Sequence, residues 1–129
     1  MEKCITVYGV SDMTGETVER IVRAASAQFV PGHVRIIILQ HATSAEDIIC
    51  FLEKQGDVAG TTAVFHTILD KRTREDLRLA LQTRRVPSID LLGSTAHVMA
   101  GLLDERPVAT PGLTIDDGAL PQYFDLQIR

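Results

Sequence analysis

Residues that could do chemistry gather in a small polar turn near the start of the chain. The turn spans residues 11–17 and follows an apolar stretch, residues 4–10, that is typical of a β-strand. Apolar residues then recur at the spacing of one helical face: Val18, Ile21, Val22, Ala25 and Phe29. A helix N-terminus presents free N–H groups and the positive end of the helix dipole. We therefore expect an anion-binding site with these candidate residues: Ser11, Asp12, Thr14, Gly15, Glu16 and Thr17.

The same turn also has a purely structural interpretation. Ser11, Asp12 and Thr14 are residue types that cap helices, and Gly15 suits a tight turn. The carboxylates of Asp12 and Glu16 would repel a highly charged group, so a single phosphate or carboxylate suits the turn better than a triphosphate. At this level, helix capping and ligand binding both remain open.

Other polar residues are expected at the carboxyl ends of later strands, which share one edge of a parallel sheet. Asp90 is the further candidate for ligand binding, because it could bind a ligand hydroxyl or cap the next helix. His41 and His66 are interpreted as surface or satisfied polar residues. No catalytic residue is assigned, because no nucleophile has a base at a recognisable spacing. No metal site is assigned either, because no cluster has the spacing of metal ligands.

Strand and helix patterns alternate four times along the chain. The expected strands span residues 4–10, 34–39, 61–67 and 88–92. Such alternation predicts an α/β fold with a parallel sheet of about four strands and helices on both faces, as in flavodoxin-like or Rossmann-like open sheets. The continuous apolar run at residues 36–39 favours a central strand. The α/β domain is predicted over residues 1–107, and residues 108–129 are predicted to form an irregular acidic tail or linker.

Local signals predict where several helices begin and which side they bury. Ser44 and Asp47 form a capping box, Gly56 ends that helix, and Asp70 or Thr73 caps the next one. The last helix is expected to bury Ala96, Met99, Leu102 and Leu103. The two cysteines, Cys4 and Cys50, are expected to be small buried side chains in a reducing cytoplasm.

Composition is that of a globular domain of 129 residues, with 45% hydrophobic and 23% charged residues. The sequence has no apolar run long enough for a membrane span and no secretory signal, which favours the cytoplasm. A net charge of −4, the absence of Trp and few aromatic residues argue against nucleic acid. Basic residues concentrate in the third helix, either as a solvated face with ion pairs or as a contact surface for an acidic partner.

The order of several short motifs resembles one known family. They occur at residues 10–17 (VSDMTGET), 23–25 (RAA), 27–29 (AQF), 66–70 (HTILD), 74–81 (REDLRLAL), 86–93 (VPSIDLLG), 111–114 (PGLT) and 123–124 (YF). In this order they resemble the N-terminal domain of the pyruvate, phosphate dikinase regulatory protein family, which includes the phosphoenolpyruvate synthase regulatory proteins. The resemblance covers nearly the whole chain.

The resemblance implies a bifunctional activity in the parent family. Family members phosphorylate a threonine of the target enzyme using ADP, and remove that phosphate with inorganic phosphate to form pyrophosphate. The implied partner is pyruvate, phosphate dikinase or phosphoenolpyruvate synthase. The implied ADP and phosphate belong to a second domain with a P-loop, which the 129 residues do not contain. We therefore expect this chain alone to be inactive.

Two alternatives remain open. The chain could be a stand-alone binding module for a small phosphorylated metabolite or a nucleotide, or it could be a ligand-free module that forms a homodimer. Both would use the same α/β fold.

Overall fold

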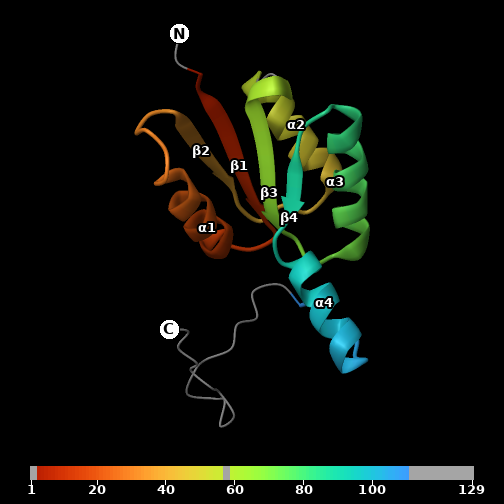
Figure 1. Cartoon of the computed structure of the whole chain (residues 1–129). Helices are drawn as coiled ribbons and strands as arrows, with labels where there is room; N and C mark the ends of the chain where they lie inside the picture. Colours follow the sequence, from red (N-terminus) through yellow and green to blue (C-terminus); the bar gives the residue numbers. More distant parts are fainter. Residues whose placement is uncertain (1–2, 57–58, 111–129) are drawn as a thin grey trace, which may run out of the picture.

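The structure is a computed structural model that describes residues 3–56 and 59–110. Strands and helices alternate along the chain (Figure 1). The elements are β1 (Ile5–Ser11), α1 (Glu16–Ser26), β2 (Val34–Leu39), α2 (Ala45–Gln55), a 3₁₀ turn (Ala59–Thr61), β3 (Thr62–Thr67), α3 (Lys71–Thr83), β4 (Ser88–Asp90) and α4 (Gly93–Leu103). The predicted tail, residues 108–129, lies outside the described residues from 111 onward.

The four strands form one parallel sheet in the order β2-β1-β3-β4. Val10 of β1 lies between Leu39 and His66, and His66 lies opposite Asp90 of β4. The predicted open α/β fold with a parallel sheet is therefore confirmed. Strand order reverses between β1 and β3, and in open α/β sheets this switch point is where ligands bind.

Helices cover both faces of the sheet, as predicted. α1 packs on one face, where Val18 and Val22 contact Val7 of β1. α2 and α3 pack on the other face around a buried core of apolar side chains: Tyr8, Val10, Ile48, Ile49, Val64, Ile68, Leu77 and Leu81. Figure 1 shows α1 alone on the near side of the sheet, with α2 and α3 behind it.

The prediction that residues 36–39 lie in a central strand was wrong. β2 is an edge strand, and β1 and β3 are central. The chain returns through α2 and places β3 on the far side of β1, so β1 takes the centre. The apolar run arises because Ile36 and Ile38 pack toward α1 while Ile37 and Leu39 pack toward the core under α2 and α3. All four side chains are only half-buried.

Two helices bury less than their sequence pattern predicts. In α1 only Val18 and Val22 are buried, whereas Ile21 and Ala25 are exposed. Phe29 is also exposed, because α1 ends at Ser26. In α4 the predicted core residues Met99, Leu102 and Leu103 are exposed. The reason is visible in Figure 1, where α4 extends beyond the carboxyl edge of the sheet instead of covering a face.

The cysteine prediction was also wrong, since Cys4 and Cys50 are both exposed free thiols. Cys4 lies before β1 begins, and Cys50 lies on α2. Helix boundaries follow their local signals more closely. The Ser44 hydroxyl accepts the N–H of Asp47 at 3.1 Å, the Asp70 carboxylate accepts the N–H of Thr73 at 2.9 Å, and Gly56 ends α2 with a φ of 69°.

Candidate functional site

The polar turn predicted to bind a ligand connects β1 to α1 at the switch point of the sheet. The Ser11 hydroxyl accepts the N–H of Met13 at 2.9 Å, and the Asp12 carboxylate accepts the N–H of Leu69 at 3.0 Å. Neither side chain caps α1. The N-cap residue of α1 is Gly15, and no side-chain hydrogen bond caps the start of this helix. The structural interpretation of Ser11 and Asp12 as helix caps was therefore wrong.

Backbone hydrogen bonds hold this turn against the loop that follows β2. The Met13 carbonyl accepts the N–H of His41 at 2.8 Å, and the Ser11 carbonyl accepts the N–H of Ala42 at 2.9 Å. Together with Asp12 and Leu69, these bonds join the carboxyl ends of β1, β2 and β3. The turn is therefore hydrogen-bonded to the loop after β2 on one side and to the loop after β3 on the other.

Gly15 is required at this junction for two independent reasons. Its φ is 86°, in the left-handed region that favours glycine. A Cβ at this position would also lie 2.8 Å from Cγ2 of Ile38. The close approach of α1 to β2 therefore depends on Gly15.

The turn leaves the first N–H groups of α1 without a side-chain cap, and such groups can bind an anion. Thr14, Glu16 and Thr17 are exposed around this helix end, whereas Ser11 is buried. The turn therefore brings together six of the seven predicted site residues. It offers hydroxyl and N–H donors, together with a carboxylate from Glu16 that disfavours highly charged ligands.

Asp90, the seventh predicted residue, belongs to a different cluster. It lies two strands away from β1, which is about 10 Å at the usual strand spacing. Its Oδ1 accepts the N–H of Gly93 at 2.7 Å, and its Oδ2 lies 3.3 Å from Nη1 of Arg74. Asp90 thus connects β4, α3 and the start of α4.

His66 is the buried member of the Asp90 cluster. Its side chain is 3% exposed, and its Nδ1 lies 4.0 Å from Oδ1 of Asp90 without a hydrogen-bond partner. Burial lowers the pKa of His66; the Asp90 carboxylate opposes this shift, and the Arg74 guanidinium adds to it. A neutral imidazole is therefore favoured.

The interpretation of the two histidines was right for one and wrong for the other. His41 is exposed, whereas His66 is buried and its Nδ1 is not satisfied. The position of His66 in the alternating pattern of β3 could have indicated that this side chain is buried. Thr62, Val64 and His66 occupy every second position and all are buried on the side of α2 and α3.

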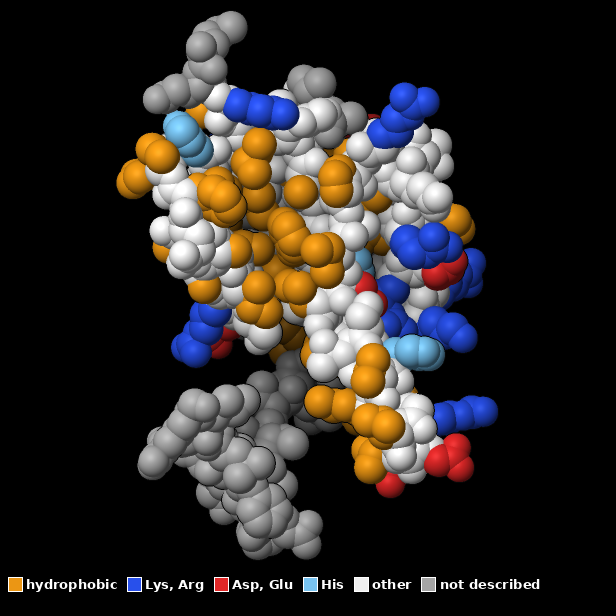
Figure 2. All heavy atoms as spheres, viewed as in Figure 1, with side chains coloured by type: hydrophobic (Ala, Val, Ile, Leu, Met, Phe, Trp, Pro, Cys, Tyr) orange, Lys and Arg blue, Asp and Glu red, His pale blue; other side chains and the backbone are white. Residues whose placement is uncertain are grey.

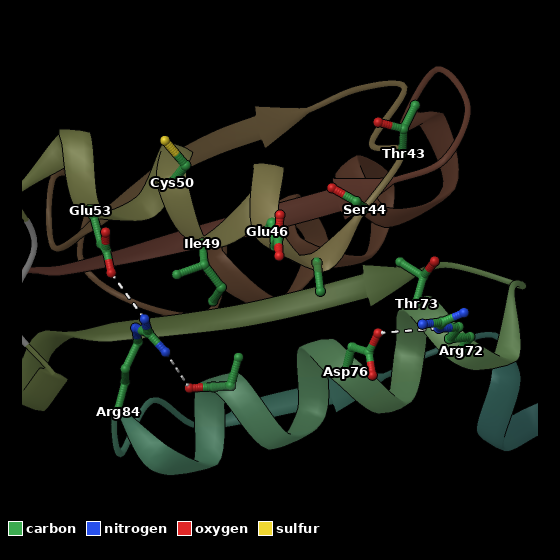
Figure 3. Close-up of a pocket in the computed structure, with 12 residues that line it drawn as sticks. Thr43, Ser44, Glu46, Ile49, Cys50, Glu53, Arg72, Thr73, Asp76 and Arg84 are labelled. Carbon is green, nitrogen blue, oxygen red and sulfur yellow. Dashed lines mark hydrogen bonds and ion pairs between the residues drawn. The ribbon is translucent and has the colours of Figure 1, made fainter.

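A third polar region, a groove of about 660 Å³, lies between α2 and α3. Figure 3 shows its two walls, with Glu46, Cys50 and Glu53 on α2 and Asp76 and Arg84 on α3. Arg84 and Glu53 form an ion pair across the groove at 3.0 Å. The sequence does not reveal this groove, because its residues come from two helices that are adjacent only in the fold.

Comparison with known protein families shows the family to which this chain belongs. A model described as kinase/pyrophosphorylase matches residues 7–125. The chain belongs to the kinase/pyrophosphorylase family.

Curated relatives of this kinase/pyrophosphorylase family member carry the name pyruvate, phosphate dikinase regulatory protein. The relative from Citrifermentans bemidjiense is 33% identical over 107 residues, and that from Geotalea daltonii is 35% identical over 107 residues. Each match covers 83% of this chain and 39% of the relative. The relative from Lysinibacillus sphaericus is 31% identical over 121 residues, which are 89% of this chain and 43% of the relative. The chain thus spans about two-fifths of the length of these relatives.

The basic helix of this family member has a solvated, ion-paired face. Arg78 pairs with Glu75 at 2.6 Å, and Arg72 pairs with Asp76 at 3.9 Å. The Arg78 guanidinium beside Glu75 lowers the pKa of that carboxyl. These pairs agree with the interpretation of α3 as a surface helix with interleaved charges.

Metal-ligand clusters and membrane-spanning helices are both absent from the described part of this kinase/pyrophosphorylase chain. Residues 3–56 and 59–110 contain no group of three His, Cys, Asp or Glu side chains that could hold a metal ion. Among the same residues, none of the helices combines the length and apolar character needed to cross a membrane.

Proposed function

We propose that this chain takes part in the regulation of pyruvate, phosphate dikinase or phosphoenolpyruvate synthase. The observation that carries the proposal is the family match over residues 7–125, together with relatives that are named as dikinase regulatory proteins. In this proposal, the parent enzyme regulates its target by phosphorylating a threonine with ADP and by removing that phosphate with inorganic phosphate. The α/β fold described above serves target or effector binding.

The connection between β1 and α1 supports a binding role over phosphoryl transfer. Phosphoryl transfer needs a cradle of backbone amides and a cation to neutralise the moving charge. Gly9 and Gly15 are spaced almost as in a P-loop, but Gly9 lies inside β1 and Gly15 is already the N-cap of α1. Only three residues remain between the end of the strand and that cap, and Glu16 stands where a P-loop has its lysine.

The purified 129-residue protein tests both parts of the proposal. We expect it to bind pyruvate, phosphate dikinase or phosphoenolpyruvate synthase in a surface-based binding assay. We also expect no phosphothreonine on either target after incubation with ADP, as measured by mass spectrometry. Binding to neither target would contradict the regulatory role, and ADP-dependent phosphorylation would contradict the assignment of transfer to other parts of the enzyme.

A second function is favoured by the helix end at the switch point. The uncapped N-terminus of α1 and the hydroxyl of Thr14 suit a single phosphate or carboxylate group of a small metabolite. In this alternative the chain is a binding module whose ligand lies at residues 11–17. A binding titration with two site variants tests it.

A further inference from the structure

On the side of α1, the outer part of the sheet face over β3 and β4 has no helix above it (Figure 1). α1 packs against Val7 of β1 and the edge strand β2, and Phe65 of β3 contacts the edge of the same apolar cluster. Over β3 and β4, Phe65 and Leu91 are half-buried, and Ile89 is 53% exposed. Figure 2 shows apolar side chains gathered over the middle of the sheet beside α1. Parallel sheets ordinarily have both faces covered, so this surface is incomplete.

α4 extends from the carboxyl edge of the sheet and carries further exposed apolar side chains (Figure 1). Val98 and Leu103 are exposed, and Leu102 is 85% exposed. A hollow of about 190 Å³ on the same helix is lined in part by Met99 and Leu103. Figure 2 shows apolar side chains on α4 and over the sheet from the same viewpoint. Exposed apolar surfaces of this kind mark interaction sites.

The start of α4 is held so that the helix points away from its own sheet. The Asp90 carboxylate binds the N–H of Gly93, and the carbonyl of His66 accepts the N–H of Leu91 at 2.9 Å. Arg74 packs so closely over Gly93 that a Cβ there would overlap its guanidinium. With this junction fixed, α4 does not cover Phe65 and Ile89.

We propose that Phe65, Ile89, Leu91, Val98, Leu102 and Leu103 form a docking face for the part of a kinase/pyrophosphorylase protein that lies outside the matched region. The relatives carry about three-fifths of their length beyond the match with this chain, enough for a further domain. The family match ends at residue 125, which is 22 residues after Leu103, the last residue of α4. The inference rests on the proposed function, because it assumes that this fold works beside the rest of the enzyme.

An apolar interface suits two domains that act as one enzyme. Interfaces between domains bury about 600–1,500 Å². The docking face offers apolar side chains from the sheet and from α4, so one partner can cover both. A partner with a matching apolar surface is therefore expected, and not a nucleic acid or a small ligand.

Co-purification tests the docking face. The tagged 129-residue chain is co-expressed with the portion of the Geotalea daltonii relative outside its matched 107 residues. We expect a stable one-to-one complex with the wild-type chain, and an at least tenfold lower recovery with Leu102→Lys or Val98→Lys. Both side chains are already exposed, so these variants should fold normally. Leu79→Lys is the matched control, because Leu79 is exposed on α3, which packs on the opposite face of the sheet.

Each outcome decides the inference. Recovery of the complex that is equal for all variants would overturn it, and so would failure of the wild-type chain to retain the relative's remainder in soluble form. Sedimentation of the chain alone adds one further outcome: a dimer that Leu102→Lys dissociates would make a second copy the occupant and would also overturn the inference. The assay contains neither ADP nor the target enzyme. Its result is therefore independent of the regulatory activity.

Discussion

The Asp12 carboxylate accepts the backbone N–H of Leu69 at 3.0 Å and so joins the carboxyl ends of β1 and β3 across the switch point. The two residues are 57 positions apart in the chain. An acceptor at this position is not needed to form either strand. It is needed to hold the turn of residues 11–17 against the loop that leads to α3.

The first prediction concerns this bond. Asp12→Ala should lower the free energy of unfolding by about 1–3 kcal/mol, because it leaves the partly buried N–H of Leu69 without an acceptor. Asp12→Asn should cost less, because an amide oxygen can still accept the bond. Urea unfolding followed by circular dichroism measures both values. Equal stability of Asp12→Ala and wild type would show that the bond contributes nothing to folding.

The second prediction concerns the packing of Gly93 under Arg74. Gly93→Ala should lower the free energy of unfolding by about 1–3 kcal/mol, because its Cβ would overlap the Arg74 guanidinium and the Asp90 carboxylate. Gly101→Ala in the same helix is the control. No atom lies within 4 Å of a Cβ there, so alanine should stabilise α4 by about 0.5–1 kcal/mol. Thermal unfolding of the two variants should give opposite shifts of Tm.

The third prediction concerns the pH dependence of stability. Burial holds the pKa of His66 below its ordinary value of 6.5. The unfolded chain therefore binds this proton more tightly than the folded chain does. The free energy of unfolding should fall as pH decreases from 6.5 and should stop falling below the pKa of the folded state. His66→Gln should reduce this dependence, as measured by urea unfolding between about pH 8 and pH 5.

The acidic limb of the same profile provides the control. Hydrogen bonds from Thr73 lower the pKa of Asp70 below its ordinary value of 3.8. The stability from this cap is present above pH 3.8 and is lost as the pH falls further. This acid loss should persist in His66→Gln. An unchanged profile between pH 8 and pH 5 would contradict the role of His66.

The fourth prediction concerns ligand binding at residues 11–17. We expect inorganic phosphate and phosphoenolpyruvate to bind the wild-type chain and to bind Ser11→Ala and Thr14→Val more weakly, as measured by calorimetric titration. ADP and phosphoenolpyruvate should both bind less well than inorganic phosphate, because each carries more negative charge and Glu16 repels it. Thr14 is exposed, so Thr14→Val should change affinity without a large change in stability. Equal affinity in all three proteins would place the site elsewhere, and no binding by any of them would leave the turn with a structural role.

Much of the fold could be predicted because its signals are local. Ser44 and Asp70 cap their helices through N–H groups only three residues away, so the short motif is sufficient to predict both caps. The alternation of strand and helix predicts the parallel sheet for a similar reason. Strand–helix–strand crossovers are almost always right-handed, so the alternation along the chain favours parallel strands in one sheet.

The candidate site was only partly predictable. The turn of residues 11–17 is one continuous segment, so its residue types and its place before a helix are visible in the sequence. Its hydrogen-bond partners are not, since Leu69 and Ala42 come from other loops. The Asp90 cluster combines three elements, and the sequence therefore suggested Asp90 without its partners Arg74 and His66.

The sequence alone determined the family, the parallel α/β architecture, the caps of α2 and α3 and the position of the polar turn. Only the tertiary structure decided that β2 is an edge strand, that His66 is buried beside Asp90, and that Leu102 of α4 faces solvent. The physical reason is that periodicity specifies which side chains seek burial, whereas the neighbours that bury them depend on strand order and helix direction. In α4 that direction is set by one carboxylate and one glycine, Asp90 and Gly93.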